Sequence, residues 1–79
     1  MNNYIQKIQD ELDRAKKKFP HYPTDYVRQV AIMAEEAGEA IKAANNMDLG
    51  VGTIEEITEE VIQTAAMCFR YLEAHGAKT

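Results

Sequence analysis

Three stretches of this chain repeat apolar residues every three or four positions, and prolines or glycines separate them. This spacing places the apolar side chains of each stretch on one face of an α-helix. Pro20 and Pro23 lie between the first and second stretches, and Gly50 and Gly52 lie between the second and third. No stretch shows the alternation that is typical of a β-strand. The sequence therefore predicts an all-α fold, with helices over about residues 3–18, 24–46 and 54–74.

Several residues carry signals for helix ends. Thr24 is the expected N-cap of the second helix. Thr53 and Glu56 have the spacing of a capping box at the start of the third helix, and Gly76 is expected to end that helix. A short connection joins the second and third helices, so we expect them to pack as an antiparallel hairpin. Gly38 lies inside the second helix, where close approach of another backbone is the expected reason for a glycine.

Each helix is expected to turn its apolar stripe toward a core. The stripe of the second helix comprises Val27, Val30, Ala31, Ala34, Ala37, Ile41 and Ala44. Apolar residues cover more than half of the third helix, which therefore needs two packing partners. A chain of 79 residues forms one domain at most, and its core is small. We expect a single helical domain over residues 1–79, a helical hairpin with an additional N-terminal helix, which completes a four-helix-type bundle as a homodimer or homotetramer.

Composition and charge exclude several classes of function. Thirteen acidic and nine basic side chains give a net charge of −4, and a nucleic-acid partner would require a basic face. The longest unbroken apolar run has five residues, so no membrane partner is expected. The first residues lack the apolar core of a secretion signal. The single cysteine, Cys68, cannot form an internal disulfide, so we expect a cytoplasmic protein.

Acidic side chains gather in two clusters on successive helices. The clusters are Glu35, Glu36 and Glu39 in the second helix and Glu56, Glu59 and Glu60 in the third. Like charges at helical spacing repel each other, and a cation with a preference for oxygen ligands, such as Mg²⁺, would relieve the repulsion. The alternative is a solvated acidic surface, because the first cluster lies opposite the apolar stripe. Ile32 falls among these glutamates, which indicates that something covers this face.

The residues Glu35-Glu36-Ala37-Gly38-Glu39 are followed, after a spacer of twenty residues, by Glu60-Val61-Ile62-Gln63. This arrangement resembles the MazG-like family of all-α nucleoside triphosphate pyrophosphohydrolases, whose pattern is Glu-Glu-x-x-Glu on one helix and Glu-x-x-Asp on the next. The resemblance extends over about residues 24–72. It departs from the family at Gln63, where the family has aspartate. A neutral side chain at this position weakens any site that needs two or more cations.

The resemblance implies hydrolysis of a ribo- or deoxyribonucleoside triphosphate to the monophosphate and pyrophosphate, with a role in clearing the nucleotide pool. It implies Mg²⁺ as the cofactor, with Mn²⁺ as a substitute. By the same resemblance, Glu36, Glu39 and Glu60 are metal ligands, and Glu35 is a further ligand or the group that orients water. Gln63 takes the place of the aspartate ligand, and its role stays open.

Two further residues are candidates for substrate contacts. Lys42 follows Glu39 by one turn and is a candidate phosphate contact, with an ordinary surface pair to Glu39 as the alternative. Tyr71 is a candidate for packing on a base, with a half-buried position at an interface as the alternative. For the whole chain, the alternative to an enzyme is a catalytically impaired helical interaction module of the same fold, because Gln63 replaces the family aspartate.

Overall fold

The computed structural model describes residues 2–75, which form three helices and contain no strand. Helix α1 spans Asn2–Lys18, α2 spans Tyr26–Asp48 and α3 spans Ile54–His75. These bounds confirm the all-α class, and they lie within two residues of those predicted from the sequence. The expected helix end at Gly76 lies outside the described residues.

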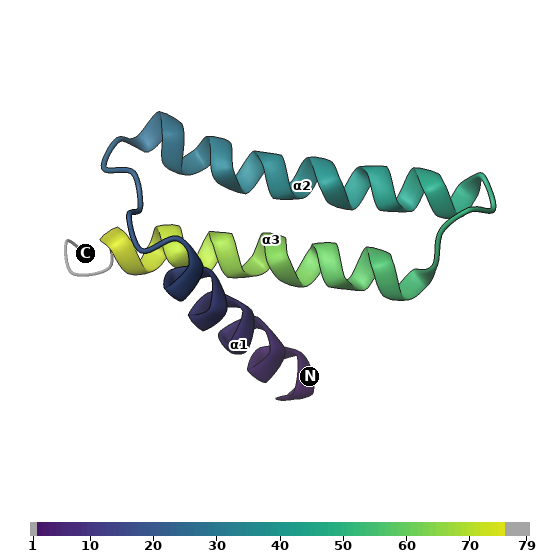
Figure 1. Cartoon of the computed structure of the whole chain (residues 1–79), viewed down its shortest axis with the longest axis horizontal. Coiled ribbons are helices and arrows are strands. Elements are labelled where there is room, and N and C mark those ends of the chain that lie inside the picture. Colours follow the sequence, from purple (N-terminus) through teal and green to yellow (C-terminus); the bar gives the residue numbers. More distant parts are fainter. Residues whose placement is uncertain (1, 76–79) are drawn as a thin grey trace.

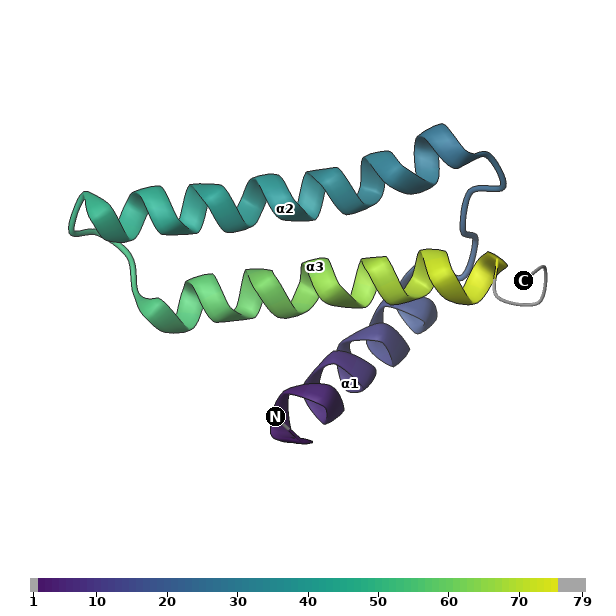
Figure 2. The ribbon, with the colours of Figure 1, turned by 180° about the vertical axis from the view of Figure 1, so that it is seen from behind.

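Helices α2 and α3 form the predicted antiparallel hairpin, and α1 crosses the side of α3 (Figures 1 and 2). Helix α3 packs against both other helices, whereas the backbones of α1 and α2 do not approach each other. Lys16 of α1 forms an ion pair with Glu73 of α3. Arg70 of α3 donates from Nη2 to the carbonyl oxygen of Phe19 at 2.7 Å. These two contacts attach the end of α1 to the last turns of α3.

Side chains and glycines fix the helix ends. Asp25 rather than Thr24 caps α2, because its carboxylate accepts from the backbone N–H of Arg28 at 3.0 Å. This hydrogen bond, more than any other contact, lowers the pKa of Asp25. At the start of α3, Thr53 Oγ1 accepts from the N–H of Glu56 at 3.2 Å, as the capping pattern predicts. The hairpin turn contains Gly50 at φ +81°, in the region that favours glycine.

The core is small and consists mainly of alanine. Its buried apolar residues are Leu12, Ala15, Ala43 and Ala66, and two polar residues, Gln29 and Arg70, are buried beside them. Gln29 is only 3% exposed and donates from Nε2 to the carbonyl oxygen of Pro23 at 2.7 Å, while its Oε1 lies 2.7 Å from His75 Nε2. One side chain thus joins α2, the α1–α2 connection and the end of α3.

The prediction that α2 turns its apolar stripe toward this core is wrong. The outer face of α2 is exposed and comprises Val27, Val30, Ala31, Ala34, Ala37 and Ile41. Val27 is 79% and Ile41 is 64% exposed, and only Ala44 of the predicted stripe is half-buried. The inner face of α2, which packs against α3, carries Gln29 and Glu36 together with the buried or half-buried apolar residues Ile32, Met33, Ala40 and Ala43. Helical spacing identified the two faces correctly, but it did not reveal which of them α3 covers.

Gly38 also differs from expectation. Nothing else in residues 2–75 lies within 4 Å of the position where a Cβ at Gly38 would stand, so no backbone of this chain explains the glycine. A helical step of 100° per residue places Gly38 on the outer face, between Ala34 and Ile41. Among the described helices, none has both the length and the apolar content needed to cross a membrane.

Candidate functional site

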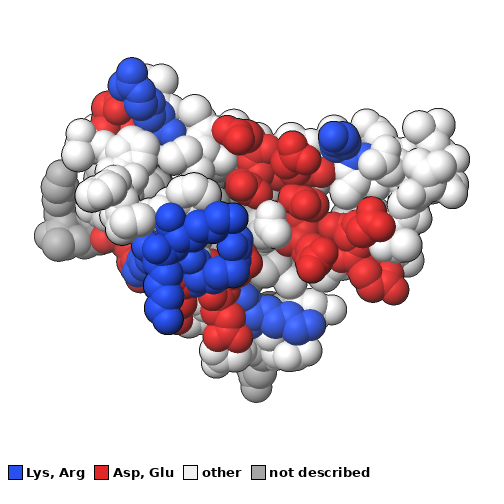
Figure 3. Space-filling model, viewed as in Figure 1, with Lys and Arg blue, Asp and Glu red and all other residues white. Residues whose placement is uncertain are grey.

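The acidic clusters of α2 and α3 lie side by side on the hairpin. Figure 3 shows acidic side chains in one band that runs from α2 to α3, with basic side chains over α1 beside it. Ile32, Glu36 and Glu60 are half-buried, so the acidic quadrant is partly covered, as the position of Ile32 indicated. The two acidic clusters meet because α2 and α3 are antiparallel. In their register, residues just before the middle of α2 lie opposite residues in the first half of α3.

Gln63 bridges the two helices between these carboxylates. With its amide nitrogen facing them, it donates to Glu36 Oε2 at 3.1 Å and to Glu60 Oε2 at 3.3 Å. This orientation is the one its neighbours require, because an ionised carboxylate only accepts hydrogen bonds. Gln63, which stands where the family pattern has aspartate, is therefore a neutral donor that holds together Glu36 and Glu60, two groups that would otherwise repel each other.

Glu36 is the carboxylate most affected by this crowding. Burial raises its pKa, and the charges of Glu60, Glu35, Glu11 and Glu39 raise it further, in that order. Both causes disfavour the ionised form. Glu11 belongs to α1, so all three helices contribute negative charge around Glu36.

Two of the hollows near the Gln63 bridge contain the predicted carboxylates. The connection cavity, so named because the α1–α2 connection forms part of its wall, has a volume of about 360 Å³. Glu35, Glu36 and Gln63 line its end nearest the bridge. The second hollow, the acidic pocket, measures about 160 Å³. Its lining includes Glu39, Lys42, Glu56, Glu59 and Glu60.

The predicted site residues are therefore divided between two neighbouring hollows. Glu35, Glu36 and Gln63 line the connection cavity, and Glu39, Glu60 and Lys42 line the acidic pocket. Lys42 forms no ion pair with Glu39 within residues 2–75, and it lies among carboxylates of both helices.

Tyr71 lies apart from these residues, in a cluster of aromatic rings at the open end of the hairpin. Its ring centroid is 4.7 Å from that of His75 and 6.4 Å from that of Tyr26, and Tyr26 and His75 stack at 4.8 Å. The cluster packs the start of α2 against the end of α3. His75 is half-buried and hydrogen-bonded to Gln29.

The oxygen atoms at this site are of the type that a hard divalent cation prefers, but their present arrangement is less suited to such an ion. Carboxylate oxygens are the ligands that Mg²⁺ prefers. Over residues 2–75, however, no three or more His, Cys, Asp or Glu side chains are grouped closely enough to hold a metal ion. The amide N–H groups of Gln63 point at Glu36 and Glu60, and they take the place that a cation between these two carboxylates would occupy. Metal binding at this site requires Gln63 to present its carbonyl oxygen instead.

Sequence reasoning missed the contribution of α1. Glu11 and Arg14 both line the connection cavity, and Arg14 donates from Nε to both carboxylate oxygens of Glu11, at 3.0 and 3.2 Å. In the sequence Glu11 precedes Leu12 and Arg14 precedes Ala15, so both residues border the buried stripe of α1, which was the available signal. Arg70 was missed as well, because its position on α3 suggested only a polar residue among apolar ones.

Comparisons with known proteins give no further identification. No protein-family model matches this chain, and no curated protein or solved structure matches it either. The resemblance to the MazG-like family therefore rests on the motif residues quoted above.

Proposed function

We propose that this protein is a Mg²⁺-dependent nucleoside triphosphate pyrophosphohydrolase that clears particular ribo- or deoxyribonucleotides from the nucleotide pool. The observation that carries the proposal is the meeting of Glu36 and Glu60, from two antiparallel helices, at Gln63 and beside a cavity. Phosphoryl transfer requires positive charge on the phosphate oxygens and a positioned water, and oxygen ligands on two rigid helices suit both needs.

Each carboxylate has a role in this proposal. Glu36, Glu39 and Glu60 hold Mg²⁺, with Mn²⁺ as a substitute, and the ion supplies positive charge to the phosphate oxygens. Glu35 serves as a further ligand or orients the water that attacks the α-phosphorus. The bond from that phosphorus to the bridging oxygen breaks, and pyrophosphate leaves with the electron pair. Lys42 contacts the departing phosphates from the acidic pocket.

The test is pyrophosphate release from a panel of ribo- and deoxyribonucleoside triphosphates, with Mg²⁺, with Mn²⁺ and with chelator. We expect metal-dependent release, and a loss of at least about 100-fold in Glu39→Gln, because the ligand stabilises developing charge in the transition state. Glu55→Gln is the matched control, since Glu55 is an exposed glutamate of α3 that lines neither hollow. Unchanged release by Glu39→Gln would refute the assignment.

A second candidate function, a helical interaction module with an impaired site, is favoured by the Gln63 bridge. The bridge relieves the repulsion between Glu36 and Glu60 without a metal. Gln63→Asp discriminates between the two candidates. Pyrophosphate release that appears only in this variant favours the module, and strong release by the unmodified protein excludes it. A melting temperature that Mg²⁺ raises only in Gln63→Asp would agree with the module, because a ligand of the folded state raises stability.

We also propose that the protein is a homodimer or homotetramer that buries the outer face of α2. The chain exposes 5863 Å², whereas a folded monomer of its mass, 8.9 kDa, exposes about 4,800 Å². The excess is similar to the roughly 800 Å² that each partner buries in a specific interface. Ala34 and Gly38 at the middle of the face allow close approach of a second helix. Val27, Val30 and Ile41 supply the apolar area.

Light scattering coupled to size-exclusion chromatography tests the assembly. Ile41→Lys is expected to yield monomers, because it places a charge within the apolar interface. Val51→Lys is the matched control, since Val51 is also an exposed apolar residue but lies in the hairpin turn. An oligomer that withstands Ile41→Lys, or an unmodified protein that is monomeric, would contradict this proposal.

A further inference from the structure

The connection cavity combines walls from all three helices. Phe19 follows α1, Tyr22 lies in the connection, Ile32 belongs to α2 and Met67 to α3, and all four line it. Its volume of about 360 Å³ lies within the range of small-molecule sites, which bring apolar walls together with a few polar groups. The apolar end of the cavity lies toward the open end of the hairpin, and the Glu36–Gln63 end lies toward the turn.

A buried guanidinium lines the apolar end. Arg70 is 8% exposed, and its Cζ lies 4.7 Å from the centre of the Tyr22 ring. Its hydrogen bond to the Phe19 carbonyl uses Nη2 alone. No carboxylate of residues 2–75 forms an ion pair with it. A buried cation without a carboxylate partner favours a ligand that brings hydrogen-bond acceptors.

Tyr22 adds a second unsatisfied group at this end. Its hydroxyl is buried, and no atom within residues 2–75 is a hydrogen-bond partner for it. Burial also raises the pKa of Tyr22. A buried hydroxyl without a partner is costly. A ligand in the adjoining cavity that reached it would remove this cost.

A second guanidinium stands at the other end, next to the carboxylates. Arg14 is held by Glu11 through Nε and Nη2, and Nη1 donates to no described residue. Hydrogen bonding to Glu11 raises the pKa of Arg14, and the charges of Glu11 and then Glu36 raise it further. Arg14 is therefore a fixed cation on the α1 side of the cavity, and it feels the charge of Glu36 on the α2 side.

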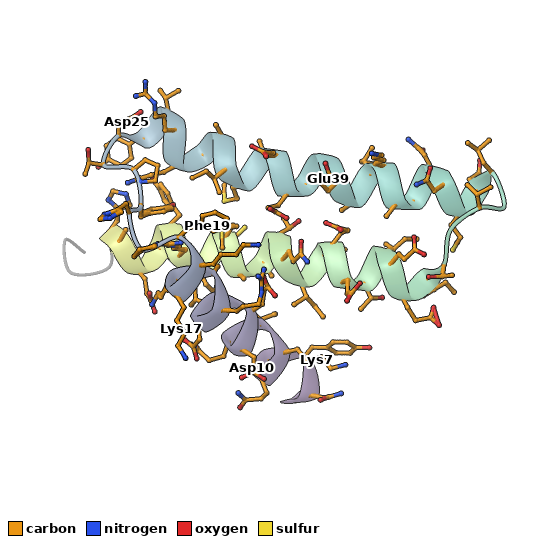
Figure 4. All side chains as sticks on the ribbon, viewed as in Figure 1. Lys7, Asp10, Lys17, Phe19, Asp25 and Glu39 are labelled. Atoms are coloured by element: carbon orange, nitrogen blue, oxygen red, sulfur yellow. The ribbon has the colours of Figure 1, made fainter. Side chains whose placement is uncertain are left out.

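We propose that the connection cavity binds the nucleoside monophosphate part of the substrate, with the base between Phe19 and the Arg70–Tyr22 end, and the α-phosphate at Arg14. This inference rests on the proposed function and adds the orientation of the substrate along the hairpin. The two departing phosphates then point past the Gln63 bridge into the acidic pocket, toward Lys42. Figure 4 shows the same order along the hairpin, with Phe19 nearer its open end and Glu39 nearer the turn.

Calorimetric titration of the four deoxynucleoside monophosphates and of inorganic pyrophosphate, in chelator, tests this placement on the unmodified protein. We expect at least one monophosphate to bind. Arg14→Gln is expected to weaken its binding about tenfold, since it removes charge-assisted hydrogen bonds to phosphate. Phe19→Ala is expected to weaken it at least about fivefold, the lower end of the contribution of a base stacked on an aromatic ring. Lys17→Gln is the matched control for charge, because it removes an exposed cation of α1 outside the cavity.

The outcomes separate this inference from the proposed function. Monophosphate binding that depends on Arg14 and Phe19, without pyrophosphate release from any triphosphate, supports the cavity and refutes the enzyme. Pyrophosphate release without measurable monophosphate binding refutes the cavity and supports the enzyme. An affinity that Arg14→Gln and Lys17→Gln reduce equally also overturns the inference, because general electrostatic attraction then accounts for the binding.

Discussion

The two faces of α2 differ in composition and in what covers them. The inner face packs on α3 and is mixed, with Gln29 and Glu36 among Ile32, Met33, Ala40 and Ala43, while the outer face has valines, alanines and an isoleucine in the open. In a chain that folds alone, the apolar face would be expected inside. The difference supports the proposal that a second copy of the chain covers the apolar outer face.

The inner face combines small apolar residues with specific hydrogen bonds. Ala43 and Ala66 are buried and small enough to let the helices of the hairpin approach closely. Gln29 satisfies the carbonyl of Pro23, and Gln63 satisfies two carboxylates. Polar side chains on this face therefore keep hydrogen-bond partners although the hairpin covers them.

The largest expected effect is on the free energy of unfolding, when substitutions of two neighbouring residues, one on each face of α2, are compared. Gln29→Ala is expected to cost about 2–3 kcal/mol of unfolding free energy, because it leaves the Pro23 carbonyl and His75 Nε2 buried without partners. Val30→Ala, next in the sequence but exposed, is expected to cost less than about 0.5 kcal/mol in the monomer. Urea unfolding at protein concentrations that keep the chain monomeric measures both. Equal losses of unfolding free energy in the two variants would show that the inner and outer faces of α2 contribute alike to the stability of the monomer.

Gly38→Ala sharpens the comparison because its effect depends on assembly. In the monomer we expect a gain of about 0.5–1 kcal/mol, since alanine favours the helix and the position is open. In the oligomer the added methyl group separates the two helices, so the dissociation constant should rise. Unfolding at low concentration and light scattering over a dilution series give the two values. A gain in stability at every concentration would argue against a helix packed at Gly38.

The smallest expected effect concerns Glu36. Its raised pKa means that the folded state prefers the protonated form, so this contribution to stability is present below the ordinary value of 4.5 and is lost as pH rises through the raised value. Glu36→Gln should therefore raise the melting temperature at pH 7 by about 2 °C, given a few tenths of a kcal/mol per like-charge pair. The gain should vanish near pH 4.

Glu55→Gln is the comparison for this pH series. Glu55 lies in the first turn of α3, where a negative charge favours the helix, so its replacement should lower the melting temperature slightly at pH 7. A melting temperature that changes in the same direction in both variants would show that the crowding around Glu36 has little effect on stability.

Local signals in the sequence predicted most of the fold. Thr53 and the glycines of the turn act on adjacent residues, so the helix bounds and the hairpin were accessible without knowledge of packing. Thr24 failed as a cap because the neighbouring Asp25 offers a charged acceptor and a contact to the Arg28 side chain. The inward face of α2 could not be predicted, because helical periodicity describes one helix and contains no information on its partners.

The candidate site was predicted in part for the same reason. Glu36, Glu60 and Gln63 meet because hairpin register follows from the length of the turn. The positions of Arg14 and Glu11 depend on the direction in which α1 crosses α3, which no pattern within α1 determines. The bridging role of Gln63 required atomic positions, since an amide has both donors and an acceptor.

The hydrogen bond from Arg70 to the Phe19 carbonyl joins residues that are 51 positions apart. Most other contacts of this fold lie within a helix or across one short turn, and such local contacts form quickly. We therefore expect the α2–α3 hairpin to form first during folding, and α1 to dock in a later step that depends on Arg70. Because Arg14 lies in α1 and Phe19 directly follows it, a kinetic intermediate with the hairpin alone would contain the acidic band but no completed cavity. Refolding followed by monophosphate binding should then lag behind refolding followed by helical circular dichroism.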